Sequence, residues 1–144
     1  MGKRRRSREL ALQALYQLDV NKENAEELLQ LFWENYSHQE EVKAFSSSII
    51  EGARRNREEI DKLINHNSEN WRLERMAVVD RNILRMAVFE LLYCSDIPYK
   101  VILNEAIEMA KKFGTEESSS FINGILDNIA KQARKGNGQL GSDV

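Results

Sequence analysis

A single proline and only seven glycines among 144 residues are the strongest constraint on what this chain can fold into. Proline and glycine are the residues that most disfavour a helix. Apolar residues also recur every three or four positions, which is the spacing of one helix face. The sequence therefore predicts an all-α protein.

The apolar pattern of the first half predicts helices separated by polar breaks. Two stripes cover residues 10–18 and 25–36, and the short break between them favours an antiparallel pair. Residues 37–40 have the Ser-x-x-Glu form of a capping box, which predicts the start of a third helix. This helix is expected to continue to Ile64 and to tolerate Gly52 at a cost of about 1 kcal/mol.

The pattern breaks at the polar residues 66–70, which are the best candidate for a boundary between two helical halves. Beyond it we expect a strongly apolar helix over residues 79–92 and a further helix that ends at Gly114. Thr115 is the expected N-cap of the last helix. Residues 136–144 are glycine-rich and polar, which predicts a disordered, flexible tail.

The composition excludes several classes of protein. One cysteine, Cys94, and two histidines, His38 and His66, are too few for a structural zinc site and form no recognisable nucleophile–base set. Gly124 is too isolated for a phosphate loop and is expected to let another helix approach closely. No apolar run approaches the roughly 20 residues of a membrane span, and no signal peptide precedes the chain. We therefore expect a cytoplasmic protein without enzymatic activity, cofactors or membrane contact.

Positive charge is concentrated at the N-terminus. Five of the 21 basic side chains precede the first acidic residue: Lys3, Arg4, Arg5, Arg6 and Arg8. The rest of the chain has 16 basic and 23 acidic side chains. Guanidinium groups this close together repel one another, bind phosphates bidentately and stack on bases. This indicates a nucleic-acid partner, with single-stranded RNA favoured over a plain solvated surface, and it predicts that the first eight residues have no fixed structure without RNA.

Five segments of the sequence resemble the NusB family of bacterial transcription antitermination factors. They occur in the family's order and span nearly the whole chain: residues 8–16 (RELALQALY), 79–85 (VDRNILR), 90–101, 104–114 and 121–127 (FINGILD). The resemblance implies about seven helices in two three-helix subdomains, here residues 1–66 and 70–135 of a single domain. That division agrees with the polar break.

The resemblance also implies a function. Members of this family bind the boxA element of nascent RNA, notably in ribosomal RNA operons. They do so as a heterodimer with NusE, a small-subunit ribosomal protein, and the pair joins the antitermination complex on RNA polymerase. No reaction is catalysed.

The family's binding residues correspond to three groups of positions here. The RNA-binding positions in the arginine-rich motif are Lys3, Arg4, Arg5, Arg6 and Arg8. Those at the start of the last helix are Glu117, Ser118, Ser119, Ser120 and Phe121. The NusE-binding positions are Tyr16, Glu74 and Asp80.

Alternatives to these roles follow from the same residues. Phe121 has the helical spacing of an ordinary core residue, and Glu74 and Asp80 suit the positive N-terminal end of the following helix. A helical adaptor or homodimer without specific RNA binding is the competing function. Salt separates the two functions, because five phosphate contacts to single-stranded RNA predict a slope of log affinity against log salt near -3.5, and apolar docking predicts almost none.

Overall fold

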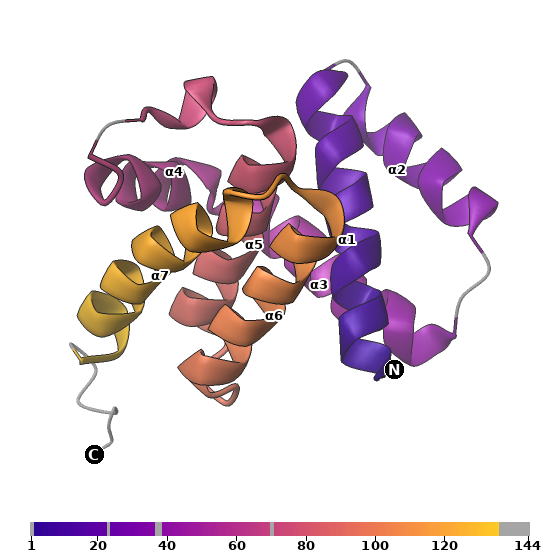
Figure 1. The fold of residues 1–144 in the computed structure, drawn as a ribbon. Coiled ribbons are helices and arrows are strands. Elements are labelled where there is room, and N and C mark those ends of the chain that lie inside the picture. The colour runs from indigo at the N-terminus through magenta and orange to yellow at the C-terminus, as the bar shows by residue number, and fades with distance from the viewer. Residues whose placement is uncertain (1, 23, 37–38, 70, 136–144) are drawn as a thin grey trace.

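The computed structural model describes residues 2–22, 24–36, 39–69 and 71–135, and within them the chain is all helical, as predicted (Figure 1). In chain order the elements are α1 (Lys3–Val20), α2 (Ala25–Asn35), α3 (Glu40–Arg55), α4 (Arg57–His66), the short 3-10 helix η1 (Leu73–Arg75), α5 (Val78–Tyr93), α6 (Tyr99–Phe113) and α7 (Ser118–Lys135).

Helix α5 lies at the centre of the molecule (Figure 1). It packs against α1, α3 and α4 on one side and against α6 and α7 on the other. Every residue from 82 to 91 is buried, including the polar Asn82, Arg85 and Glu90. A helix enclosed on all sides must satisfy such groups internally, so these three residues are the natural anchors for contacts between the halves.

The hydrophobic core is continuous across the predicted boundary between the halves. It contains Leu10 and Ile49 from the first half together with Ile83, Ile102 and Ile129 from the second. Because α1 and α3 pack directly on α5, the first half is closed by a helix of the second. The division into two subdomains stays a prediction.

The long third helix predicted from residue 37 to Ile64 is broken at Asn56. That residue has φ -106° and ψ 21°, outside the helical range, and it separates α3 from α4. Its side-chain Nδ2 donates to the carbonyl oxygen of Gly52 at 2.9 Å. Asparagine competes with the helix for backbone hydrogen bonds in this way, which explains the break.

Close approach of a neighbouring helix was predicted at Gly124, but it occurs at Gly52. A Cβ at Gly52 would lie 2.0 Å from the ring of Phe89, so the close approach of another helix occurs here, between α3 and α5. A Cβ at Gly124 would meet no atom within 4 Å. The expectation of close packing at Gly124 is therefore wrong, since that face of α7 is open.

Other expectations about helix ends have mixed outcomes. The last helix begins at Ser118, so Thr115 is not its N-cap; the Thr115 amide instead donates to Ser118 Oγ at 2.9 Å. The predicted capping box includes residues 37 and 38, which lie outside the described residues, as does the predicted tail at 136–144.

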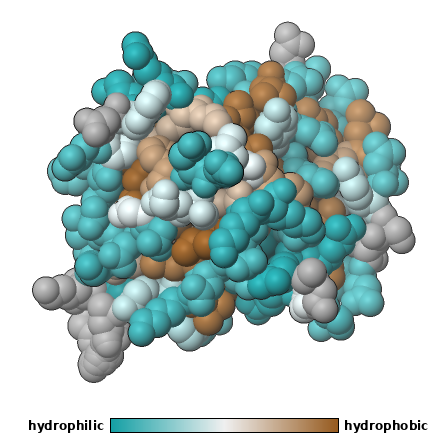
Figure 2. Space-filling model, viewed as in Figure 1, coloured by the Kyte–Doolittle hydropathy of each residue, from teal (hydrophilic) through white to brown (hydrophobic). Residues whose placement is uncertain are grey.

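Hydrophilic side chains cover most of the face drawn in Figure 2, with smaller hydrophobic areas between them. The large apolar side chains that are exposed are Tyr16, Val20, Leu31, Trp71, Tyr93, Val101 and Phe113. No helix in the described part of the chain has the length and apolar character needed to cross a membrane.

Candidate nucleic-acid interface

The first turn of α1 presents cations where a helix does not favour them. Lys3, Arg4 and Arg6 are exposed, and no acidic residue lies in this turn. The N-terminal end of a helix already carries partial positive charge, so cations there oppose the helix dipole. Free backbone N–H groups and guanidinium groups therefore point to an anionic ligand at the same end.

Neighbouring helices hold two of these cations in place. The Lys3 ammonium pairs with Glu41 of α3, and the Arg4 guanidinium lies 3.9 Å from the centre of the Phe45 ring. The side chain of Arg6 makes no hydrogen bond or ion pair with any residue that the structure describes. Arg6 is therefore the cation most available to a ligand.

Arg5 forms a bidentate pair with Glu105 of α6, with Nε and Nη2 donating at 3.0 and 2.7 Å. The hydrogen bonds and the charge of Glu105 raise the pKa of Arg5 above its ordinary value. In return, the hydrogen bonds from Arg5 lower the pKa of Glu105. Arg5 is half-exposed but already has an anionic partner, so it is less available than Arg6.

Arg8 is a correction to the predicted RNA-binding set, because it is buried. Its Nε and Nη2 donate to the two carboxylate oxygens of Glu90 at 2.9 and 2.7 Å, and the two side chains are 4% and 2% exposed. Burial alone would lower the pKa of Arg8, but the hydrogen bonds and charge of Glu90 raise it above the ordinary value. This pair ties α1 to the central helix α5, and its guanidinium is not accessible to a ligand.

The N-terminal residues are also more ordered than expected. Helix α1 begins at Lys3, and only Met1 lies outside the described residues at this end. The predicted repulsion among the arginines is relieved because Arg5 and Arg8 have carboxylate partners and Arg4 lies over an aromatic ring. The expectation that the first eight residues lack fixed structure is therefore wrong for Lys3 to Arg8.

The start of α7 exposes only part of its predicted set. Ser118 is 1% exposed, and its hydroxyl is used by the loop from Thr115, so it is not available to RNA. Glu117 and Ser120 are exposed, whereas Ser119 and Phe121 are half-buried. Phe121 packs against the core, as its helical spacing predicted, and it also lines an open hollow; its contact with RNA stays a prediction.

The structure does not bring the two predicted RNA-binding segments into contact. The N-terminus lies at the lower end of α1, whereas α7 begins near the centre of the view, after the loop that follows α6 (Figure 1). Three ion pairs join α1 to α6: Arg5 and Arg8 with Glu105, and Glu9 with Lys112 at 3.0 Å. A ligand that touches both segments has to cross the last turn of α6.

The predicted partner-binding residues gather around Arg81. Its guanidinium holds Asp19, one turn beyond Tyr16, and Nη1 donates to the Glu74 carbonyl oxygen at 3.3 Å. Tyr16 is 41% exposed and Glu74 is exposed. Asp80 is half-buried, and its Oδ1 has no hydrogen-bond partner among the described residues. A buried carboxylate oxygen without a partner is unusual, and its burial keeps this oxygen out of reach of another protein.

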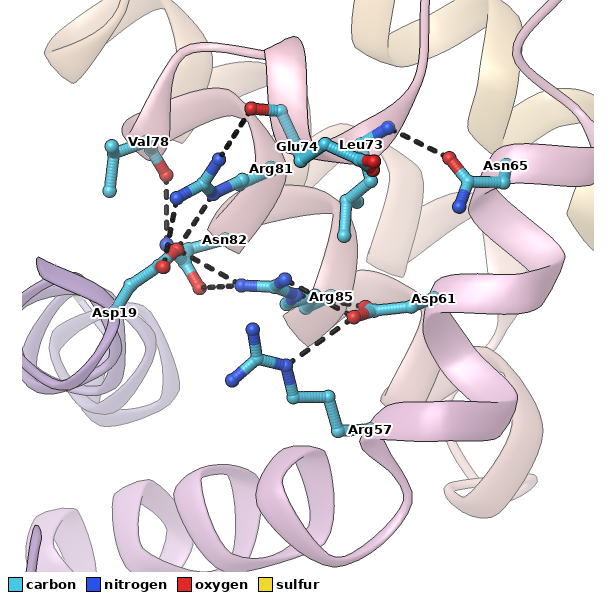
Figure 3. A network of polar contacts seen from close by, with 10 residues as sticks. All are labelled: Asp19, Arg57, Asp61, Asn65, Leu73, Glu74, Val78, Arg81, Asn82 and Arg85. Atoms are coloured by element: carbon cyan, nitrogen blue, oxygen red, sulfur yellow. Dashed lines mark hydrogen bonds and ion pairs between the residues drawn. The ribbon is translucent and has the colours of Figure 1, made fainter. Parts of the chain in front are cut away.

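A buried polar network behind this region was not predicted from the sequence (Figure 3). Asp19 of α1 accepts from Arg81 at 2.8 Å, from Asn82 at 2.8 Å and from Arg85 at 3.0 Å, and Arg85 also pairs with Asp61 of α4 at 2.9 Å. Burial alone would raise the pKa of Asp19, but the hydrogen bonds from Arg81 and Asn82 and the charge of Arg85 lower it to about 2. Arginines four residues apart in an apolar helix are the signal that could have indicated this network.

The described part of the chain has no group of side chains that could bind a metal ion. Among the residues that the structure describes, no three histidine, cysteine or carboxylate side chains are grouped closely enough to hold a metal ion. Burial raises the pKa of the half-buried Cys94 thiol, with the charges of Glu90 and Asp96 acting in the same direction, which disfavours a reactive thiolate.

Comparison with known proteins identifies the family. A sequence model of the NusB family matches residues 5–131. The chain belongs to the NusB family. Two curated relatives bear the name transcription antitermination protein NusB. The one from Syntrophus aciditrophicus is 50% identical over 137 residues, 95% of this chain and 85% of the relative. The one from Myxococcus xanthus is 48% identical over 139 residues, 94% of this chain and 99% of the relative.

Solved structures of NusB proteins have the same fold. NusB from T. maritima superimposes with a TM-score of 0.84 at 43% identity, covering 94% of this chain and 96% of that one. A structure of the antitermination factors NusB and NusE in complex with double-stranded RNA matches with a TM-score of 0.80 at 27% identity, covering 90% and 97%. The arrangement of α1 to α7 is therefore that of the NusB family.

Proposed function

We propose that this NusB-family protein is a transcription antitermination factor. It binds boxA-type single-stranded RNA of nascent transcripts, notably those of ribosomal RNA operons, as a heterodimer with NusE. The pair then joins the antitermination complex on RNA polymerase in the cytoplasm. The protein acts by binding and catalyses no reaction.

The observation that carries the proposal is the set of exposed cations on the first turn of α1. Lys3, Arg4 and Arg6 lie at the positive end of a helix on a protein whose remaining charge is acidic. Such a concentration of positive charge favours the binding of phosphate groups. Relatives named as antitermination proteins, and a related NusB solved with NusE and RNA, support the same function.

The region around Arg81 is the proposed NusE site. Tyr16 supplies an exposed aromatic anchor, and Glu74 and Asp80 supply negative charge suited to a basic ribosomal protein. The Asp19 network fixes the ends of α1 and α5 that carry these residues. NusE bound here would leave the first turn of α1 free, because Arg4 and Tyr16 lie more than three helical turns apart.

Fluorescence anisotropy tests the proposal with three RNAs: a boxA-like single strand, a scrambled single strand and a duplex of the boxA-like sequence, each with and without NusE. We expect tighter binding of the boxA-like single strand, strengthened by NusE. Since Arg8 is buried and Arg5 is paired, about three phosphate contacts remain, and the slope of log affinity against log salt should be near -2.

A triple variant of Lys3, Arg4 and Arg6 to alanine should abolish this binding. The matched control removes three exposed cations elsewhere, with Arg55, Lys62 and Lys100 changed to alanine, and should bind as the wild type does. Equal losses in both triple variants, or equal binding of all three RNAs, would contradict specific recognition and favour the adaptor function. Preference for the duplex would contradict the single-strand assignment alone.

A further inference from the structure

A hollow of about 590 Å³ lies between the C-terminal end of α4, with the segment that follows it, and one face of α7. The two helices are neighbours (Figure 1), and Gln132 Nε2 of α7 donates to Asn67 Oδ1 at 3.5 Å. The hollow begins at Phe121, so it continues directly from the first turn of α7. None of its other lining residues belongs to the RNA-binding set predicted from the sequence.

Two aromatic rings line this hollow. Trp71 is 52% exposed, which is unusual for the largest apolar side chain, and Phe121 is half-buried from the side of α7. The backbone beneath Trp71 is held in place, because Ser68 Oγ donates to the Trp71 carbonyl oxygen at 2.5 Å and Ser68 itself is buried. An exposed indole on a backbone held in this way offers a surface on which a flat ligand can stack.

The rest of the lining suits the edge of a flat polar ligand. Asn128 and His66 carry side chains that both donate and accept hydrogen bonds, whereas the Asn67 amide already donates to the Leu63 carbonyl oxygen at 2.9 Å. Gly124 lies between the ring of Phe121 and Asn128 along α7, and the space above its Cα is empty to 4 Å. A planar group can therefore approach the backbone of α7 closely at this point.

The charge of the residues that line the hollow favours a base over a phosphate as the ligand. The hollow contains no lysine or arginine, and it contains one acidic residue, Glu69. A phosphate would be repelled there, whereas a carboxylate can accept from the amino group of a base. We propose that this hollow binds one unpaired RNA base, stacked on Trp71. This inference rests on the RNA binding proposed above, and it extends the RNA-binding surface from the first turn of α7 to the segment after α4.

The experiment measures by fluorescence anisotropy how tightly this protein, paired with NusE, binds the boxA-like single strand. Trp71→Ala should weaken binding roughly tenfold, the loss typical of one stacked base. Gly124→Leu should cause a similar loss by filling the hollow, and it should not disturb the helix, because a Cβ at this position meets no atom within 4 Å and leucine favours a helix more than glycine does. Gly124→Ala, which adds a single methyl group, should bind as the wild type does.

The matched control is Tyr93→Ala, an aromatic that is 49% exposed and lies outside the hollow. If Trp71→Ala and Gly124→Leu bind RNA as tightly as this control, while the Lys3, Arg4 and Arg6 variant does not bind, the base site is overturned and RNA binding by α1 stands. If both variants instead weaken binding of NusE without RNA, the hollow takes a protein segment and the proposal is wrong. A wild-type protein that binds no RNA overturns both.

Discussion

Two clusters of arginines in the molecule differ in their burial and in their hydrogen-bond partners. At the start of α1, Arg4 and Arg6 are exposed; at the start of α5, Arg85 is buried and Arg81 nearly so, and both share the carboxylate of Asp19. The first cluster has spare hydrogen-bonding capacity and the second has little. In these two clusters, burial separates the arginines that pair with a carboxylate of the protein itself from those that remain available to a ligand.

Replacing Arg8 should have the largest effect on stability. Arg8 lies next to the exposed arginines in the sequence, but it is buried and paired like the arginines of α5. Arg8→Ala leaves the Glu90 carboxylate buried without a partner, and such a loss costs about 3–5 kcal/mol of the free energy of unfolding. Urea unfolding followed by circular dichroism measures it. The double variant Arg8→Met, Glu90→Leu should recover much of the loss, and a single variant as stable as wild type would place Arg8 with the exposed cations.

The second prediction concerns acid and the buried cluster. The pKa of Asp19 is about 2 in the folded protein, against an ordinary 3.8, so the unfolded chain takes up the proton first as the pH falls. Its stabilisation, about 2 kcal/mol, is therefore complete above pH 3.8 and is lost as the pH falls toward 2. Unfolding measured between pH 5 and about 2.5 should show the wild type converging on Asp19→Asn. Parallel profiles for the two proteins would contradict the pairing.

A change at Glu105 tests whether Arg5, now paired within the protein, can be made available to a ligand. Glu105→Gln removes the carboxylate that holds Arg5 and should free this guanidinium for RNA. One further phosphate contact steepens the slope of log affinity against log salt by about 0.7. Glu108→Gln, a loss of the same charge one turn along α6, is the control and should leave the slope unchanged; equal slopes in all three proteins would show that Arg5 stays committed elsewhere.

Arg6→Ala should have the smallest effect on folding. This side chain is exposed and has no partner in the described part of the chain, so the free energy of unfolding should change by no more than about 0.5 kcal/mol. For the Arg6→Ala variant, the slope of log RNA affinity against log salt should become shallower by about 0.7. A thermal unfolding shift as large as that of Arg8→Ala would erase the distinction between the two clusters.

The helical fold could be predicted because it depends on a pattern repeated along the whole chain, and the NusB-family match agrees with it. The break at Asn56 could not, since one side-chain hydrogen bond decides it. Close helix packing was predicted at Gly124 and occurs at Gly52 instead, because it depends on Phe89, a neighbour distant in the sequence.

The candidate site shows the same limit. The sequence correctly indicated where positive charge is concentrated, but the inward face of α1 at Arg8 depends on Glu90, which lies 82 residues away. The hollow beside Trp71 joins residues from two segments about 50 positions apart. Neither of these contacts between distant segments can be predicted from the spacing of residues that are close in the sequence. Whether these residues bind RNA stays a prediction.

The anchoring of α1 by Arg8 has a consequence for how fast and how tightly an anion can bind. A chain that becomes helical only on contact with its ligand loses roughly 1–2 kcal/mol of conformational entropy for each residue ordered. Residues 3 to 8 are already helical and clamped to α5, so this ordering happens during folding. Encounter with a ligand then needs no preceding coil-to-helix transition, and the spacing of the exposed guanidinium groups is preorganised.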